Sequence, residues 1–205
     1  QYWLPVTLGP IMAAAQRDLR LISPYFVPGA EGVRWLGGMR ARGVEVGVLT
    51  NSLAANDVVA VHGGYAGYRK PLLEAGVELF ELMPHGQSNS SLFGSSGASL
   101  HTKAFAVDGE TGFIGSFNMD PRSVSLNTEM GVVFQDREVT AELLKSYASK
   151  TAAANSYRVA LEQGALRWQD GSVEPPKVWT HEPETSWWRR ATARVIGWLP
   201  VESQL

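Results

Sequence analysis

Apolar and polar positions in the first 83 residues follow two periodicities. Three short, mostly apolar runs have the length and composition of buried strands and lie at residues 18–23, 44–49 and 77–83. Before and between them, apolar residues recur at helical spacing, which predicts helices at residues 8–16, 33–42 and 58–75. Asp57 stands where the third helix would be capped, and Gly76 where it would end. This order of helix and strand is typical of a sheet with helical crossovers.

The rest of the chain adds shorter runs of the same kinds. Further strands are predicted at residues 100–107, 112–117, 130–134, 158–161 and 166–169. A helix is predicted to start at Asp136, and its expected core stripe is Val139, Leu143 and Tyr147. Residues 86–99 are polar and rich in Gly and Ser, as in a surface loop or a lid over a substrate. We therefore expect an α/β domain at residues 1–182, with a mixed central sheet flanked by helices.

Residues 183–205 form a separate tail that is rich in Trp and Arg. Thr185 or Ser186 can cap a helix there. One side of that helix would carry Trp188, Ala191, Val195 and Leu199, and the rest would carry Arg189, Arg190 and Arg194. Such an amphipathic helix is typical of an interfacial segment on an anionic membrane. A tail packed back on the domain has the same pattern, so both interpretations stay open.

Composition limits the class of protein. The 205 residues are 44% hydrophobic and 19% charged, which suits an ordinary globular core. Eighteen basic and twenty acidic residues give a net charge of −2, so we expect no nucleic acid as a partner. The sequence has no cysteine, which excludes disulfides and thiolate metal sites. Because it begins at Gln1 rather than Met, we expect a fragment whose missing part could carry a signal or membrane helix.

Chemically capable residues are concentrated between residues 101 and 129. On a strand, His101 and Lys103 project to the same face because they lie two residues apart. Ser116 and Asn118 share a face of the next strand, and Glu129 lies on the third. If these strands are neighbours, an imidazole, an ammonium, a hydroxyl, an amide and a carboxylate converge.

This set of groups suits phosphoryl transfer without a metal. A neutral histidine attacks phosphorus, and a carboxylate on its other nitrogen fixes the tautomer. Lysine and polar groups bind the phosphoryl oxygens. A strand with a surface His101 and Lys103, and Glu129 on a solvated face, is the alternative. The full spacing favours the site.

The segment resembles the signature of the phospholipase D superfamily, H-x-K-x4-D-x6-G-S-x-N. Its fixed positions are filled by His101, Lys103, Asp108, Gly115, Ser116 and Asn118. The resemblance implies a phosphohistidine intermediate and catalytic roles for His101, Lys103 and Asp108, with Asp108 mostly structural or polarising the site. It places Glu129 as the carboxylate that supports the histidine and Ser116 and Asn118 as substrate-binding residues. It implies no cofactor and no metal.

Further segments resemble bacterial cardiolipin synthases of the phospholipase D type. They are residues 21–28, 64–73, 118–123 and 199–205, and the tail is similar to the C-type subgroup. The resemblance implies a phosphatidyltransferase that makes cardiolipin from phosphatidylglycerol and a second phospholipid. It also implies a peripheral protein on the cytoplasmic side of the bacterial inner membrane, with the anionic membrane surface as a partner. A hydrolytic phospholipase D or phosphodiesterase, including a nuclease, and a non-catalytic lipid-binding half are the alternatives.

The family's active site needs two such motifs, and this sequence has one. His62, His85 and His181 are not followed by Lys at the second position. The expected partner is therefore an N-terminal half with its own motif, or a second copy of the chain about a two-fold axis.

Three features outside the motif have simpler explanations. We expect His62 to pack within its helix, Arg69 and Lys70 to be solvated, and Asp120 and Arg122 to form an ion pair that holds a loop.

Overall fold

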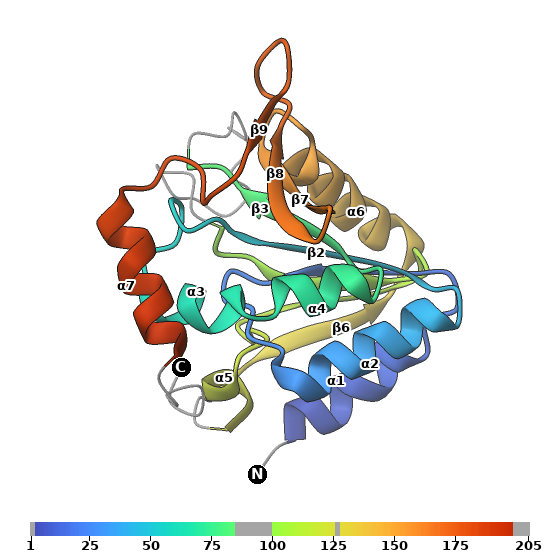
Figure 1. The fold of residues 1–205 in the computed structure, drawn as a ribbon. Helices are drawn as coiled ribbons and strands as arrows, with labels where there is room; N and C mark the ends of the chain where they lie inside the picture. Colours follow the sequence, from blue (N-terminus) through green and yellow to red (C-terminus); the bar gives the residue numbers. More distant parts are fainter. Residues whose placement is uncertain (1–2, 85–99, 126–127, 199–205) are drawn as a thin grey trace.

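The computed structural model describes residues 3–84, 100–125 and 128–198 as one nine-stranded mixed sheet with helices on both faces (Figure 1). The strands are β1 (Asp18–Ile22), β2 (Glu45–Asn51), β3 (Glu78–Leu82), β4 (Lys103–Val107), β5 (Thr111–Gly115), β6 (Gly131–Gln135), β7 (Ser156–Glu162), β8 (Ala165–Asp170) and β9 (Lys177–Trp179). The helices are α1 (Trp3–Ala13), α2 (Gly29–Ala41), α3 (Val59–Ala66), α4 (Arg69–Glu74), α5 (Pro121–Ser125), α6 (Arg137–Thr151) and α7 (Trp187–Trp198). The expected α/β fold with a mixed central sheet is confirmed.

The strand order is β6-β5-β4-β1-β2-β3-β7-β8-β9. β1, β2 and β3 are parallel neighbours joined by the helical crossovers that the sequence predicts. β4, β5 and β6 pair antiparallel on one side of this unit, and β7, β8 and β9 on the other. The chain therefore brings the three motif-bearing strands together as consecutive neighbours.

The core has two layers, one on each face of the sheet. Helices α1 to α4 cover one face, where Leu21 and Phe105 are buried, and α6 covers the other, where Ile22 and Ala104 are buried (Figure 1). Adjacent strand residues thus face opposite layers. Because both faces are covered, successive residues such as Leu21 and Ile22 of β1 are both buried.

The predicted helix at 58–75 is wrong in its continuity, because it is split into α3 and α4. Pro71 in the first turn of α4 has no N–H to bond the carbonyl of Gly67, and this lost hydrogen bond, with glycine at 67, favours a break between the two helices. Asp57 does not cap α3, since the N-cap residue is Val58.

Helix α6 starts as predicted, since the Asp136 carboxylate accepts from the backbone N–H of Glu138 at 2.8 Å and of Val139 at 3.0 Å. The expected core stripe is wrong at Val139, which is 46% exposed, whereas Thr140 is buried beside Leu143 and Tyr147. The stripe differs because the helix turns Thr140, one residue later, toward the sheet. The expected loop at 86–99 lies outside the described residues.

Helix α7 packs across α3, as a tail folded back on the domain would. A Cβ atom on Gly63 would lie 2.7 Å from the carbonyl oxygen of Ala193, and one on Gly197 would lie 2.8 Å from that of Gly63. Glycine at both positions therefore permits this close crossing. Ser186 acts as the predicted cap, because its Oγ accepts from the N–H of Arg189 at 3.3 Å.

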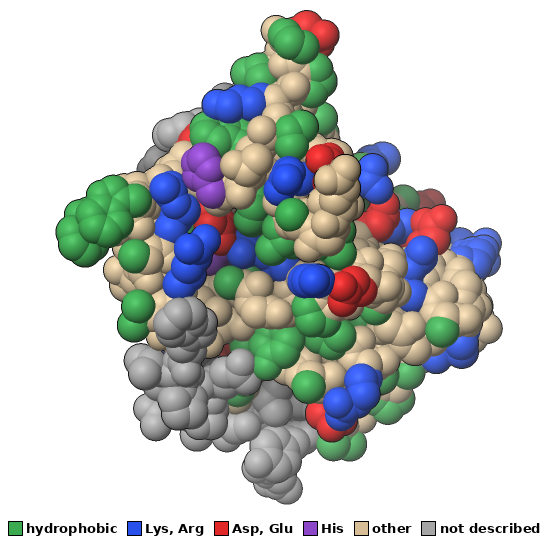
Figure 2. All heavy atoms as spheres, viewed as in Figure 1, with side chains coloured by type: hydrophobic (Ala, Val, Ile, Leu, Met, Phe, Trp, Pro, Cys, Tyr) green, Lys and Arg blue, Asp and Glu red, His purple; other side chains and the backbone are tan. Residues whose placement is uncertain are grey.

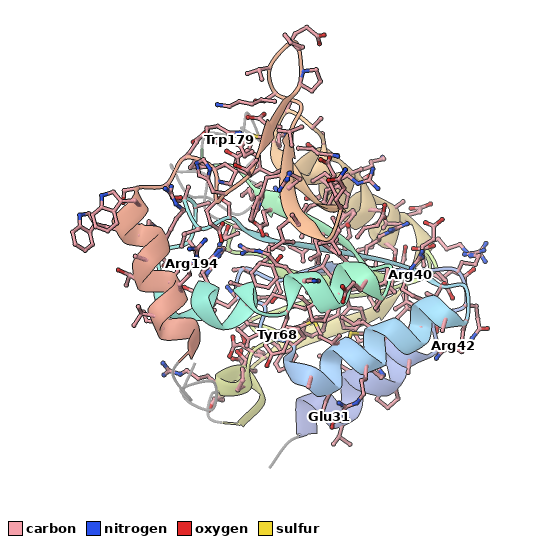
Figure 3. All side chains as sticks on the ribbon, viewed as in Figure 1. Glu31, Arg40, Arg42, Tyr68, Trp179 and Arg194 are labelled. Carbon is pink, nitrogen blue, oxygen red and sulfur yellow. The ribbon has the colours of Figure 1, made fainter. Side chains whose placement is uncertain are left out.

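The exposed face of α7 carries aromatic side chains. Trp187 and Trp188 stack at a centroid distance of 3.7 Å and are 58% and 66% exposed. Figure 2 shows an apolar protrusion at the left edge of the molecule, where α7 begins. The guanidinium groups of Arg189 and Arg190 donate to the backbone carbonyls of Leu53 and Thr185, which fixes these two side chains against the domain. Arg194 extends from α7 on the side of α3 and is exposed (Figure 3).

Candidate active site

Most of the predicted site residues lie at the same end of the neighbouring strands β4, β5 and β6. Gly115 pairs with Lys103 on one side and with Gly131 on the other, so these strand ends are aligned. Lys103 opens β4, Ser116 follows β5, and Glu129 lies two residues before β6. The first two strands are shorter than predicted, so His101, Ser116 and Asn118 lie just outside β4 and β5, whereas Lys103 is the first residue of β4.

His101 lies two residues before β4 with an exposed side chain. Its backbone carbonyl accepts from the Lys103 ammonium, with an Nζ to O distance of 2.7 Å. The lysine is thus held beside the histidine while the ring stays open to a substrate.

Glu129 is buried and its carboxylate accepts from the hydroxyl of Ser116. The Ser116 Oγ also accepts from the backbone N–H of Met130 at 2.9 Å. The structure therefore places Glu129 on Ser116. A contact from Glu129 to the ring of His101 stays a prediction.

Lys103 is 7% exposed, and burial lowers the pKa of its ammonium. The nearby carboxylates of Glu129, Asp57 and Asp120 oppose this shift. One cation thus lies within the field of three acidic groups.

The sequence analysis missed two residues as members of the site: Asp57, whose carboxylate acts on Lys103, and Tyr25, which bonds to Asp57. Tyr25 donates from its hydroxyl to the Asp57 carboxylate at 2.8 Å. Burial first, and then this hydrogen bond to Asp57, raise the pKa of Tyr25 to about 12. Tyr25 belongs to the segment 21–28 that carries the family resemblance, but nothing in the sequence pairs it with Asp57.

Asn118 and Asp120 lie on the segment that follows β5. Asn118 is buried, and its Oδ1 has no hydrogen-bond partner among the described residues. Asp120 accepts from the backbone N–H of Ser123 at 2.8 Å and thereby caps α5. The expected ion pair with Arg122 is replaced by this cap, because the carboxylate turns toward the helix start. Burial raises the pKa of Asp120, although its hydrogen bonds oppose the shift.

Comparison with known proteins identifies the family. The family model described as "Cardiolipin synthase, PLD-like domain" matches residues 9–150. The chain belongs to this family. It is 45% identical over 97% of its length to cardiolipin synthase C of Escherichia coli, and 31% identical over 75% of its length to cardiolipin synthase A of Proteus mirabilis. It spans 43% of the first relative and 28% of the second, less than half of each.

Solved structures of the phospholipase D family share the fold. The phospholipase D family member Nuc of Salmonella typhimurium superposes with a TM-score of 0.55 at 19% identity, over 75% of this chain and 90% of its own. Phosphatidylserine synthase of Haemophilus influenzae gives a TM-score of 0.58 at 12% identity, over 95% of this chain and 41% of its own. At these identities the comparison supports the fold alone.

Asp108 of this phospholipase D-like domain lies at the opposite end of β4 from Lys103. At about 3.3 Å per residue, the five steps between the two residues span roughly 16 Å. Its carboxylate accepts from the backbone N–H groups of Gln16, Arg17 and Asp18 at 2.8–2.9 Å. Burial opposes ionisation, but these bonds outweigh it and hold the pKa of Asp108 below its ordinary value. The contacts fasten the segment that leads into β1 and do not reach His101.

His62 and Arg69 belong to a buried network. The expectation that His62 packs inside the fold is confirmed, and the expectation that Arg69 is solvated is wrong. Arg69 donates to Glu81 and to Glu182, each at 2.7 Å. His62 Nε2 lies 3.2 Å from Glu182 Oε1. Arg69 is buried because two carboxylates pair with it inside the fold, whereas Lys70 is exposed as expected.

The described residues contain neither a metal-binding cluster nor a helix that could span a membrane. Within the described residues, no three His, Asp or Glu side chains are placed to hold a metal ion. Over the same ranges, no helix combines the length and apolar character needed to cross a bilayer.

Proposed function

We propose that this chain is one catalytic half of a cardiolipin synthase that transfers a phosphatidyl group through a phosphohistidine on His101. The proposal rests on the strand register: Lys103 pairs with Gly115, so the segments that carry His101, Ser116 and Asn118 leave β4 and β5 at the same end, within the matched family region. Phosphatidylglycerol and a second phospholipid are the substrates.

Each step of the proposed transfer is carried out by a side chain of this chain or of its partner. An imidazole nitrogen of His101 attacks phosphorus, and the bond from phosphorus to the first alcohol oxygen breaks. A histidine of the second motif gives that alcohol its proton and then takes the proton of the acceptor hydroxyl. The acceptor oxygen attacks phosphorus, and the bond from phosphorus to His101 breaks. Lys103 and the amide of Asn118 bind the phosphoryl oxygens.

The local charge supports a second half-site. A single ammonium, that of Lys103, lies near the carboxylates of Glu129, Asp57 and Asp120. A phosphodiester is itself an anion, so binding it here needs positive groups from elsewhere. The missing motif, on an N-terminal half or on a second copy, supplies its own histidine and lysine. Asp108 then has a structural role through its three backbone contacts.

The exposed tryptophans support a membrane partner. Trp187 and Trp188 lie outward on a helix without acidic residues, and Arg194, further along the same helix, is also exposed. Aromatic and basic side chains of this kind suit an anionic lipid interface. We assign residues 183–205 as a tail that docks on the cytoplasmic side of the bacterial inner membrane.

Product analysis tests the transfer. The intact protein that contains this chain is incubated with vesicles of phosphatidylglycerol, alone and mixed with a second phospholipid of labelled headgroup, and lipids are separated after quenching with denaturant at neutral pH. We expect cardiolipin and the free headgroup alcohol of the donor lipid, unaffected by a chelator, and a phosphatidyl adduct on the peptide that contains His101. Phosphatidic acid as the sole product would favour the hydrolytic alternative, in which water is the acceptor. A folded protein that forms neither product nor adduct would contradict both.

A further inference from the structure

A groove of about 400 Å³ opens beside the candidate active site. Its walls come from α1, from the start of α2 with the segment before it, and from the segment after β5. The residues that matter here are Gly9, Met12, Trp35, Leu36, Met119 and Asp120. The size lies within the range of about 300–1,000 Å³ typical of small-molecule sites.

The groove adjoins the segment that carries the site residue Asn118. Met119 follows Asn118 directly and lines the groove, and its backbone carbonyl accepts from the N–H of Val27 at 2.7 Å, which joins two of the walls. Among the described wall residues, Asp120 is the charged one, and its carboxylate acts on the ammonium of Lys103. One end of the groove therefore lies next to the segment of the site, and the apolar remainder leads away between α1 and α2.

We propose that this groove holds one acyl chain of a phospholipid substrate while its phosphate lies at His101. The inference rests on the proposed function, because a phosphatidyl donor or acceptor places hydrocarbon a short distance from the reacting phosphorus. At about 30 Å³ for each water-sized group, the volume holds roughly 13 such groups, comparable to a chain of methylenes. Apolar walls that end at a charged site match the order of groups in a phospholipid, and burial of the chain is favourable.

Gly9 offers a way to fill the groove without disturbing its neighbours. A Cβ atom at Gly9 meets no atom within 4 Å, and the residue lines the groove. Gly9→Leu extends a side chain into this space. Because Gly9 precedes Pro10, any added Cβ meets the same restriction on the backbone. Gly9→Ala carries that restriction and leaves the groove open, so it is the matched control.

Photolabelling tests occupancy directly. The intact protein that contains this chain is irradiated with phosphatidylglycerol that carries a diazirine on one acyl chain, in detergent micelles, and the labelled peptides are mapped by mass spectrometry. In the Gly9→Ala protein we expect labels on peptides that contain Met12, Trp35 or Met119. Long-chain phosphatidylglycerol should compete and the dihexanoyl lipid should not. Gly9→Leu should reduce these labels at least tenfold.

Kinetics separates this inference from the proposed function. Gly9→Leu should lower kcat/KM at least tenfold for a long-chain substrate and leave the value for the dihexanoyl substrate within twofold of the Gly9→Ala protein. Equal labelling in both variants, or labels confined to α7, would overturn the acyl-chain site even where transfer is intact. If the groove is labelled in a protein that shows no transfer, the acyl-chain site is supported and the proposed function is contradicted. Equal loss on both substrates together with weakened assembly would show that protein covers the groove, which also overturns the proposal.

Discussion

The exposed ring of His101 is the residue on which the proposed chemistry depends. Replacement with Ala removes the proposed nucleophile, so we expect transfer by the intact protein to fall more than about 1,000-fold. Because the side chain is exposed, the free energy of unfolding should change by no more than about 0.5 kcal/mol. Turnover and urea unfolding of the same preparation check both parts. Substantial turnover by a folded His101→Ala protein would remove the nucleophile from this position.

Asp108 belongs to the same signature but has different contacts. Asp108→Ala leaves three backbone N–H groups without their acceptor and should lower the free energy of unfolding by about 1–3 kcal/mol. Since the folded-state pKa is lowered, the stabilisation is present above the ordinary value of 3.8 and is lost as the pH falls through the lowered pKa. Urea unfolding from pH 7 to below pH 4 should therefore show a smaller difference between variant and parent at low pH.

The Asp108→Asn variant separates structure from catalysis. The Asn side chain keeps one acceptor oxygen, and position 108 lies about 16 Å from Lys103 along the strand. We expect the folded enzyme to keep kcat within about tenfold of the parent, far from the loss expected at His101. A loss of kcat as large as that of His101→Ala, at unchanged stability, would assign Asp108 to the reacting groups.

At the scale of elements, sequence predicts what depends on local pattern. The strands that carry the motif follow from the run of strand-forming residues, and the cap of α6 follows from Asp136 at its start. Both signals lie in residues that are near one another in the sequence. Contacts between distant segments do not follow. The bond from Tyr25 to Asp57 and the burial of Arg69 depend on how helices pack on the sheet, and a polar side chain in a helix pattern gives no sign of a buried partner.

The two helices α3 and α4 are joined to the sheet and to the start of the tail by the network around Arg69. Although burial favours the neutral acid, Arg69 and His62 lower the pKa of Glu182 to about 2. Arg69→Met leaves the Glu81 and Glu182 carboxylates buried without their cation, which should cost about 3–5 kcal/mol of stability. Lys70→Met, at the exposed neighbour, should change stability by less than about 0.5 kcal/mol. Equal effects in urea unfolding would contradict a structural role for the network.

At the scale of the whole molecule, one motif cannot complete the proposed reaction. We expect the 205-residue chain, isolated as a monomer, to show no transfer with phosphatidylglycerol, because the second histidine is missing. Light scattering establishes the oligomeric state of the assayed sample. Addition of the separate N-terminal half should restore turnover. Activity of a strict monomer would refute the shared site.

The orientation of the molecule on a bilayer depends on α7. Its two exposed tryptophans are held in place because Arg189 donates to the Leu53 carbonyl at 3.1 Å and the helix crosses α3 closely. Each cation near an anionic surface contributes about 1 kcal/mol, so the three arginines of α7 give about 3 kcal/mol at most and the indole rings must supply the rest of the binding. We expect weak, salt-sensitive flotation with phosphatidylglycerol vesicles.

Point variants test this better than removal of the tail, which would uncover the surface of α3. Trp187→Ser with Trp188→Ser should reduce the bound fraction at least about fivefold, because both rings leave the interface. Val173→Ser with Val178→Ser is the matched control, since these valines are also exposed but lie away from α7. Flotation of both double variants at low and high salt compares the two surfaces. If the tryptophan variant floats as well as the valine variant, α7 serves only to cover α3, and the membrane contact lies on the other half of the protein.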